Sequence, residues 1–298
     1  MEGRVYQYCS APAPLQAFES GPLEGSENAL VVMGGLTDGL LPTTYTPPLA
    51  AAVAAEGWAT VQPLLRGSYC QFGTGGLDRD VEDLSSLLKF LRDRRGAKRV
   101  ALLGHSTGCQ ITARFLADDG TGGSEELRSM VVLAVLQAPV SDREAGPLSG
   151  VNVSEVVAEA RLAVGAGNGS RLISHALYGF IPLSAQRALD LFDRLGADDM
   201  FSSDMTGSEL SSRLGHLGRC GAHVLLALSM DDQYVPLAGA GGSGYADLGK
   251  RLLDAVTGSE GDASNATLLM INGADHALSD KSHALQLVHA VVEQIRCL

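Results

Sequence analysis

The sequence predicts an α/β fold, in which helices cover both faces of a mostly parallel sheet. Short apolar runs bounded by turn residues alternate with segments of helical periodicity along most of the chain, as βαβ units require. The 298 residues are 45% hydrophobic and 19% charged, which is a globular composition. A single large domain of this length can bury its core without a disulfide or a metal.

The first half of the chain alternates strands and helices after an N-terminal pair of strands. Residues 4–20 contain two short strand candidates, separated by Ala11-Pro12-Ala13-Pro14. A continuous apolar run predicts a buried strand at 29–33, and leucines at helical spacing predict a helix at 80–95. The other predicted elements are a helix at 49–56, a strand at 58–65, a glycine-rich loop at 67–76, a strand at 99–103, a helix at 107–116 and a strand at 130–136.

The second half contains a long segment without a clear strand. Residues 141–221 are helical in pattern, with Ser, Gly and Ala breaks, and they precede a strand at 223–228. A helix at 247–256, a strand at 266–271 and a closing helix at 281–295 follow. The pattern therefore predicts an α/β core made of residues 1–140 and 222–298, with an inserted helical cap at 141–221.

Charge and apolar patterning argue against several function classes. The 22 Lys and Arg against 34 Asp and Glu give a net charge of −12, which disfavours non-specific binding to nucleic acid or to an anionic membrane. The longest apolar run, 130–140, is too short to span a membrane, and residues 1–20 lack a signal-peptide core. Five cysteines without a CxxC pair indicate free thiols. We expect a cytoplasmic protein with a small-molecule partner; the oligomeric state stays open.

Gly104-His105-Ser106-Thr107-Gly108 is the one GxSxG motif of the chain. The motif alone is weak evidence, because a chain with 36 glycines can contain it by chance. Its context is more specific, since a predicted strand leads into it and a predicted helix follows at once. Such a turn lifts the hydroxyl above the sheet at a helix N-terminus, where negative charge is favoured. Ser106 is therefore the candidate nucleophile.

A serine needs a base before it can act as a nucleophile. Of the seven histidines, His276 follows the last predicted strand, at the carboxyl end of the sheet, where open parallel sheets place their sites. The others fall in the elbow, in the predicted cap, at a strand start or on the closing helix, and we interpret them as structural: His105, His175, His216, His223, His283 and His289.

An acid must orient the imidazole and stabilise its charged form. Asp231 and Asp232 follow the strand at 223–228, a few residues ahead of Val235-Pro236. We favour Asp232, with Asp231 as the alternative. The chain order Ser106, Asp232, His276 is that of the α/β-hydrolase class, so the sequence predicts an α/β-hydrolase fold.

Two backbone N–H groups are expected to hold a developing oxyanion. One belongs to Thr107, directly after the nucleophile. The other comes from the loop after the strand at 29–33, where Gly34-Gly35 lets backbone rather than side chain face a substrate. We assign this second group to Leu36. Asp38 either holds the loop through its side chain or only ends a turn.

Five strings of the sequence point to a known family. They are Gly34-Gly35-Leu36-Thr37-Asp38-Gly39-Leu40, Leu103-Gly104-His105-Ser106-Thr107-Gly108-Cys109-Gln110, Gln137-Ala138-Pro139-Val140-Ser141-Asp142-Arg143-Glu144-Ala145, Asp198-Asp199-Met200-Phe201-Ser202-Ser203-Asp204, and residues 232–236. They resemble one family of α/β-hydrolases, found in fungi, plants and protists and long catalogued as being of unknown function. Fungal siderophore esterases, which hydrolyse ester bonds in fusarinine-type hydroxamates, resemble this group.

The resemblance runs from about residue 29 to 290 and implies Ser106, Asp232 and His276 as the catalytic triad. Family members often carry Asn directly after the histidine, whereas Ala277 stands here. This difference leaves the triad intact and bears on the hydrogen bonding around it. A siderophore-type ester substrate is implied by the resemblance alone.

Two residues of the predicted cap are candidates for substrate binding. Arg143 follows a strand at the carboxyl end of the sheet, and it either contacts an anionic substrate group or pairs with Asp142 or Glu144. Phe201 belongs to a set of aromatic residues that either form the cap core or line the pocket. That set is Tyr178, Phe180, Phe192 and Phe201.

Three aspartates of the predicted cap raise the question of a metal site. Asp198, Asp199 and Asp204 stand close together in sequence and carry ligand-type oxygens. A capped helix start followed by a surface turn accounts for the same string without an ion. We therefore expect no metal and no cofactor.

These residues predict a serine esterase. Ser106 attacks a carboxylic ester, His276 takes its proton and returns it to the leaving alcohol, and water then hydrolyses the acyl-enzyme. Acyl transfer, thioester cleavage or amide cleavage by the same residues stays open. A non-catalytic protein that uses this fold to bind a ligand or a partner is the alternative of a different class.

Overall fold

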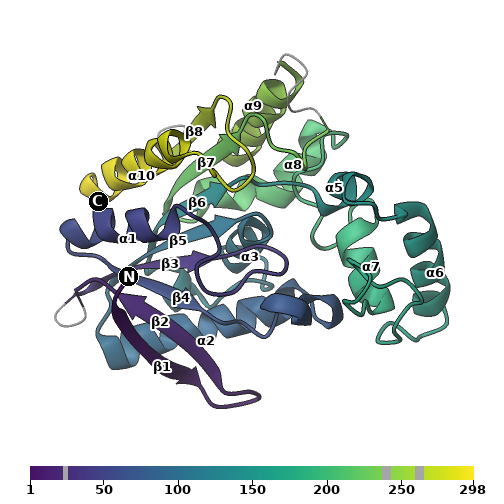
Figure 1. Cartoon of the computed structure of the whole chain (residues 1–298), viewed down its shortest axis with the longest axis horizontal. Coiled ribbons are helices and arrows are strands. Elements are labelled where there is room, and N and C mark those ends of the chain that lie inside the picture. Colours follow the sequence, from purple (N-terminus) through teal and green to yellow (C-terminus); the bar gives the residue numbers. More distant parts are fainter. Residues whose placement is uncertain (23–25, 237–242, 259–264) are drawn as a thin grey trace.

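A computed structural model describes residues 1–22, 26–236, 243–258 and 265–298 of the chain (Figure 1). The strands are β1 (Gly3–Cys9), β2 (Leu15–Ser20), β3 (Asn28–Met33), β4 (Ala59–Pro63), β5 (Arg99–His105), β6 (Val131–Gln137), β7 (His223–Ser229) and β8 (Ala266–Ile271). The helices are α1 (Thr46–Ala55), α2 (Leu77–Arg95), α3 (Gly108–Phe115), α4 (Glu125–Arg128), α5 (Asp142–Leu148), α6 (Val153–Gly165), α7 (Ala185–Phe192), α8 (Gly207–Leu214), α9 (Ser243–Thr257) and α10 (Lys281–Arg296), with 3-10 helices η1 (Tyr69–Thr74) and η2 (Gly215–Arg219).

The described strands form a single sheet in the order β1-β2-β4-β3-β5-β6-β7-β8. From β4 to β8 all neighbouring strands run parallel, whereas β2 pairs antiparallel with both β1 and β4. The central strands are buried on both faces, which explains their continuous apolar sequences. The predicted mostly parallel α/β fold is confirmed, with an antiparallel pair at one edge.

Helices on the two faces of the sheet bury separate hydrophobic clusters. Along β3, Leu30 and Val32 face a cluster formed with α1 and α10. Val31 and Met33 face the larger cluster, which includes residues of α2, α3, α8 and α9. Successive strand residues point to opposite faces, so one strand contributes to both clusters. The predicted coverage of both faces is therefore confirmed (Figure 1).

Helices α5, α6 and α7 gather beyond the carboxyl ends of the strands (Figure 1). Residues of α6 and α7 form a third hydrophobic cluster, which also includes Phe72 of η1. Further along the predicted cap, Met205, Leu210 and Leu214 belong instead to the larger cluster of the sheet. The segment 141–221 thus divides between two clusters, and its definition as an inserted cap stays a prediction.

Several helix ends differ from the predicted ones for local reasons. α1 begins at Thr46, because its prolines occupy the first helical turn, where Pro needs no hydrogen-bonding N–H. α2 begins at Leu77 after the extended Gly76, and it carries acidic residues in its first turn and arginines in its last. The predicted glycine-rich loop contains η1, and α4 is an additional short helix.

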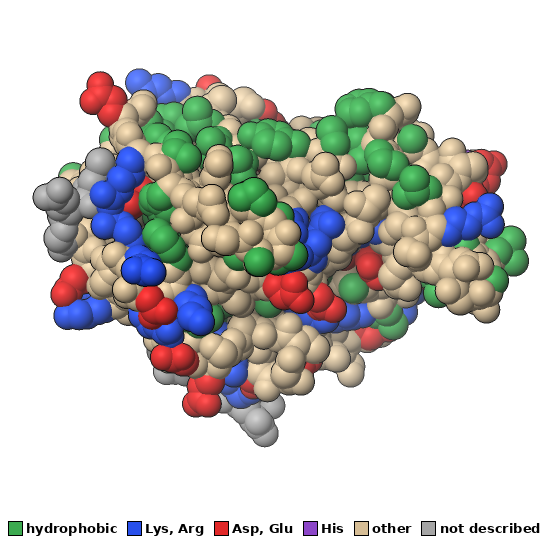
Figure 2. All heavy atoms as spheres, turned by 90° about the horizontal axis from the view of Figure 1, so that it is seen from below, with side chains coloured by type: hydrophobic (Ala, Val, Ile, Leu, Met, Phe, Trp, Pro, Cys, Tyr) green, Lys and Arg blue, Asp and Glu red, His purple; other side chains and the backbone are tan. Residues whose placement is uncertain are grey.

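Acidic and basic side chains lie beside one another on the face shown in Figure 2. The arginines at the end of α2 follow this pattern, because Arg92 pairs with Asp93 and Glu126, and Arg95 pairs with Glu19. These pairs offset the positive charges of Arg92 and Arg95. Within the described residues, no helix has the length and apolar character needed to cross a membrane.

Candidate active site

Ser106 lies in the sharp turn between β5 and α3. Its φ of 54° is a left-handed conformation that costs energy in a residue other than glycine. The turn is held by two hydrogen bonds: the Ser106 N–H donates to the Gln137 carbonyl at 3.0 Å, and the Cys109 N–H donates to the Ser106 carbonyl at 2.8 Å. Glycine is needed at 104, because a Cβ there would collide with the Gly108 backbone. The GxSxG sequence thus folds into a strained elbow.

His276 and Asp232 are in direct contact. Nδ1 of His276 lies 2.6 Å from Oδ2 of Asp232, and both residues are buried. The other carboxylate oxygen of Asp232 accepts the Tyr234 N–H at 2.9 Å, and the Tyr234 ring packs edge-on against the imidazole. Asp231 is exposed, and its N–H donates to the carbonyl of Ala274. The structure therefore brings Asp232, rather than Asp231, to the imidazole.

Ser106 and His276 line one cavity of about 200 Å³ at the carboxyl ends of the strands. The loop after β3 contributes Leu36 and Asp38 to its wall. The segment from α5 to α7 contributes mainly apolar side chains and one carboxylate, namely Val151, Leu177, Tyr178, Phe192 and Asp142. The cavity therefore lies between the sheet and helices α5 to α7, where a small ligand can reach the serine.

The loop after β3 packs directly against Ser106. A Cβ on Gly35 would lie 2.6 Å from the Cβ of Ser106, so only glycine allows this approach. Oδ2 of Asp38 accepts the Gly35 N–H at 2.8 Å, and its side chain therefore holds the loop. Among the described residues, the N–H groups of Leu36 and Thr107 have no hydrogen-bond acceptor. Unpaired N–H groups beside a nucleophile are what an oxyanion needs.

Gln137, at the end of β6, joins several parts of the site and was not predicted from the sequence. Its Oε1 accepts the Tyr45 hydroxyl at 2.9 Å and lies 2.5 Å from Nδ1 of His105, while its Nε2 donates to the His276 carbonyl at 3.1 Å. Burial and the nearby His276 lower the pKa of His105 to about 3, so His105 is neutral near pH 7. The string beginning Gln137-Ala138-Pro139 marked this position without indicating its role.

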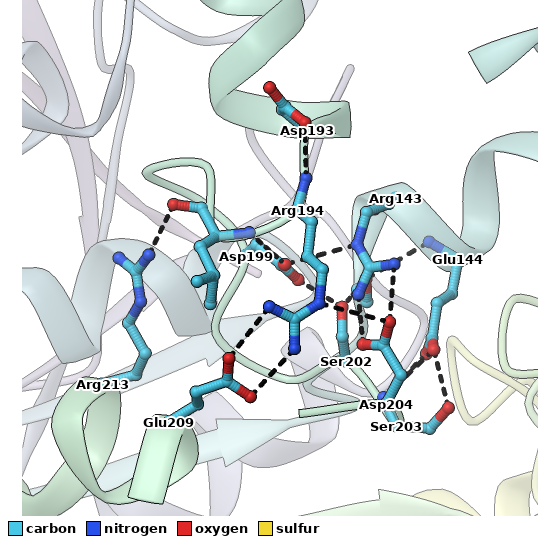
Figure 3. A network of polar contacts seen from close by, with 12 residues as sticks. Arg143, Glu144, Asp193, Arg194, Asp199, Ser202, Ser203, Asp204, Glu209 and Arg213 are labelled. Atoms are coloured by element: carbon cyan, nitrogen blue, oxygen red, sulfur yellow. Dashed lines mark hydrogen bonds and ion pairs between the residues drawn. The ribbon is translucent and has the colours of Figure 1, made fainter. Parts of the chain in front are cut away.

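Arg143 is not among the residues that line this cavity, and its assignment as a substrate contact stays a prediction. Its guanidinium pairs with Asp199 at 3.3 Å and with Asp204 at 2.5 Å (Figure 3). Neither of these is the predicted partner Asp142 or Glu144. Two carboxylates from a distant part of the chain thus hold Arg143 in a structural ion-pair network.

Phe201 is not among the lining residues of this cavity either, and its assignment as a substrate contact also stays a prediction. It is about 1% exposed and belongs to the larger hydrophobic cluster of the sheet. Of the other aromatic residues considered with it, Tyr178 and Phe192 line the cavity, whereas Phe180 is exposed. Positions 178 and 192 therefore contribute to the aromatic wall of the cavity, together with Tyr234.

Each of the three aspartates near residue 200 faces an arginine. Asp198 accepts a hydrogen bond from Arg187 at 2.6 Å, Asp199 pairs with Arg143, and Asp204 pairs with both Arg143 and Arg194. Within the described ranges, no group of three or more metal-ligating side chains occurs. Each of these carboxylates thus has an arginine as an ion-pair partner.

A second, smaller cavity of about 30 Å³ lies behind the loop after β3, and Asp80, Thr107 and Arg187 line it. Oδ1 of Asp80, Oγ1 of Thr107 and Oδ2 of Asp198 are buried without a hydrogen-bond partner. Burial raises the pKa of Asp80 to about 6, although Arg187 and Arg79 oppose the shift. Buried charge therefore lies next to the candidate oxyanion loop.

We expect Asp80 to make the free energy of unfolding depend on pH. Burial raises its pKa from 3.8 to about 6, so the folded state keeps a proton that the unfolded state has released. The resulting stability is fully present below about pH 4 and is lost as the pH rises through about 6. Asp80→Asn is neutral throughout, so its stability relative to wild type should increase from about pH 4 to about pH 7 and stay constant at higher pH. Urea unfolding measures this, and a constant difference would contradict the raised pKa.

Searches by sequence find relatives among fungal proteins. A UPF0613 protein of Schizosaccharomyces pombe is 31% identical over 273 residues, which cover 86% of this chain and 83% of the relative. The fusarinine C esterase of Aspergillus fumigatus is 29% identical over 70% of this chain and 72% of its own length. The resemblance indicated by the five strings is thereby confirmed.

Solved structures show the same architecture over nearly the whole chain. The siderophore hydrolase EstB from Aspergillus fumigatus superimposes with a TM-score of 0.78 at 27% identity, covering 99% of this chain and 97% of that one. An α/β-hydrolase fold protein of unknown function gives a TM-score of 0.69 at 20% identity, with 99% and 96% covered. The predicted α/β-hydrolase fold is confirmed. The model of the family described as protein of unknown function (DUF1749) matches residues 2–297, and the chain therefore belongs to this family.

Proposed function

We propose that this chain is a serine hydrolase that cleaves carboxylic esters of small molecules. The observation that carries the proposal is the 2.6 Å contact between His276 Nδ1 and Asp232, with Ser106 lining the same cavity as His276. Nucleophile, base and orienting acid follow three different strands, β5, β8 and β7, and their chain order is that of α/β-hydrolases.

The geometry supports acyl transfer to water through a covalent intermediate. Asp232 fixes the imidazole with its N–H on Nδ1, which leaves Nε2 free to take the Ser106 proton. The serine oxygen bonds to the ester carbonyl carbon, and the N–H groups of Leu36 and Thr107 stabilise the oxyanion. His276 then protonates the leaving alcohol. A water molecule, deprotonated by the same imidazole, attacks the acyl-enzyme and releases the acid.

Siderophore-type esters are the substrate class that the relatives favour. One relative is named a fusarinine C esterase, and one solved neighbour is named a siderophore hydrolase. We extend this class to the present chain as part of the proposal. Thioesters, amides and acyl acceptors other than water use the same residues, so product analysis has to distinguish them.

Labelling with a fluorophosphonate tests the proposal, because the probe forms an adduct only with an activated serine. We expect one adduct, mapped to Ser106 by peptide mass, and its loss in Ser106→Ala and His276→Ala. Ser149→Ala is the matched control, because Ser149 lines the same cavity. This variant should still form the adduct on Ser106. Folded wild type that takes up no probe would contradict the proposal and favour a ligand-binding protein.

A further inference from the structure

Asp142, the first residue of α5, lines the same cavity as Ser106 and His276. It is about 8% exposed, and Oδ2 accepts the side-chain amide of Gln110 at 3.2 Å. Its Oδ1 accepts no hydrogen bond from another described residue. A buried carboxylate is ordinarily paired with a cation or held by several donors, and Asp142 has neither within the described chain.

The arginines near Asp142 are bound to other groups. Arg187 donates to Asp198 at 2.6 Å and to the Phe72 carbonyl at 3.1 Å. Arg143 pairs with two further aspartates, as described above. Burial, reinforced by Asp198, raises the pKa of Asp142 to about 7, although Arg187 opposes the shift. Asp142 therefore lacks a counter-charge on the side that faces the cavity.

The charged lining of the cavity is acidic. Asp38 and Asp142 contribute carboxylates, and the described residues that line the cavity include no lysine or arginine. His105 is neutral near pH 7 because of its lowered pKa. The rings of Tyr178, Phe192 and Tyr234 complete the wall, and aromatic faces attract cations. A substrate carboxylate would be repelled here, whereas an ammonium group would find both a counter-charge and aromatic contacts.

We propose that Asp142 binds an ammonium group of the substrate, so that the cavity selects esters that carry a protonated amine. The inference rests on the ester hydrolysis proposed above and names a specificity-determining residue for it. The loop after β3 and the elbow hold the scissile carbonyl, and α5 presents the carboxylate that binds the amine. A single small cavity thus recognises both groups of one molecule.

Three p-nitrophenyl esters with the same five-methylene chain test the proposal: the 6-aminohexanoate ends in an ammonium, the heptanoate in a methyl group and the pimelate monoester in a carboxylate. We expect wild type to show a kcat/KM for the cationic ester about 10- to 100-fold above that for the neutral one. The anionic ester should be the poorest substrate. In Asp142→Asn the ratio of cationic to neutral ester should fall to about 1.

Asp80→Asn is the matched control, because Asp80 is also a buried carboxylate of raised pKa but lines the second cavity instead. It should keep the wild-type ratio. Equal kcat/KM for the cationic and neutral esters in wild type would overturn the inference and leave the esterase proposal standing. A ratio that survives in Asp142→Asn would also overturn it.

Two measurements keep the inference testable if the esters are poor substrates or the variant does not fold. Hexylamine, but not hexanoate, should slow fluorophosphonate labelling of Ser106, and absence of protection would overturn the inference.

In wild type, the ratio of kcat/KM for the cationic ester to that for the neutral ester should rise from about pH 6 to about pH 8, because Asp142 ionises there while the amine stays charged. Asp198, Asp199 and Arg187 are the charged groups that act electrostatically on Asp142. A flat ratio would contradict the proposal.

Discussion

Replacing Asp232 by asparagine is expected to lower kcat for ester hydrolysis by roughly 10³- to 10⁴-fold. The carboxylate accepts the Nδ1 proton of His276 at 2.6 Å in a buried setting, and an amide cannot stabilise the imidazolium that forms during attack. Asparagine also permits the tautomer in which Nε2 carries the proton and cannot accept one from Ser106. Steady-state kinetics on a p-nitrophenyl ester measures the effect.

Asp231→Asn is the control for this prediction. Asp231 precedes Asp232 directly, but it is exposed and its described hydrogen bond uses only backbone atoms. Its substitution should leave kcat within about twofold of wild type. If both variants lose activity to the same degree, or if only Asp231→Asn does, the assignment of the acid is wrong.

Replacing Arg187 by methionine is expected to lower the free energy of unfolding by about 3–5 kcal/mol. Its guanidinium is about 2% exposed and pairs with a fully buried Asp198 at 2.6 Å. The charges of Asp80 and Asp142 also act on it. Removal leaves the buried carboxylate of Asp198 without the cation that pairs with it. Urea unfolding, followed by circular dichroism, measures the loss.

The double variant Arg187→Met with Asp198→Leu separates loss of charge pairing from loss of packing. Because it removes both ions of the pair, it should be more stable than Arg187→Met alone. Arg194→Ala provides a surface comparison, since its pairing with Glu209 is solvent-exposed and its loss should hardly change the unfolding midpoint. If Arg187→Met and Arg194→Ala have the same urea unfolding midpoint, the stabilising role of the buried cation is refuted.

The sequence was sufficient for features that depend on strand ends. A strand that leads into Gly104-His105-Ser106 and is followed at once by a helix is typical of few folds. The loops after β7 and β8 lie at the carboxyl end of the sheet, where such folds place their sites. The positions of Ser106, Asp232 and His276 follow from where these strands stop. The parallel sheet follows from apolar runs that are continuous because both faces are covered.

The local sequence pattern does not predict the roles of Arg143, Phe201 and Gln137. Asp204, the partner of Arg143, lies 61 residues away along the chain, and no periodicity encodes such a pairing. Phe201 is apolar, and only the packing of its segment decides whether it faces the cavity or the sheet. Gln137 acquires its role because four separate segments, through Tyr45, His105, Ser229 and His276, meet at its side-chain amide. The residue type at one position of the sequence does not indicate such a meeting.

The residues of the reaction and one wall of the cavity lie in different parts of the chain, and this affects how substrate preference can change. The elbow, the acid and the base sit on loops anchored in the sheet, whereas one wall of the cavity belongs to helices with their own hydrophobic cluster. Substitutions at positions such as 142, 178 or 192 can therefore alter ligand preference while the reaction geometry is inherited unchanged. A new ligand preference can thus arise in one region of the chain while the residues that carry out the reaction stay as they are.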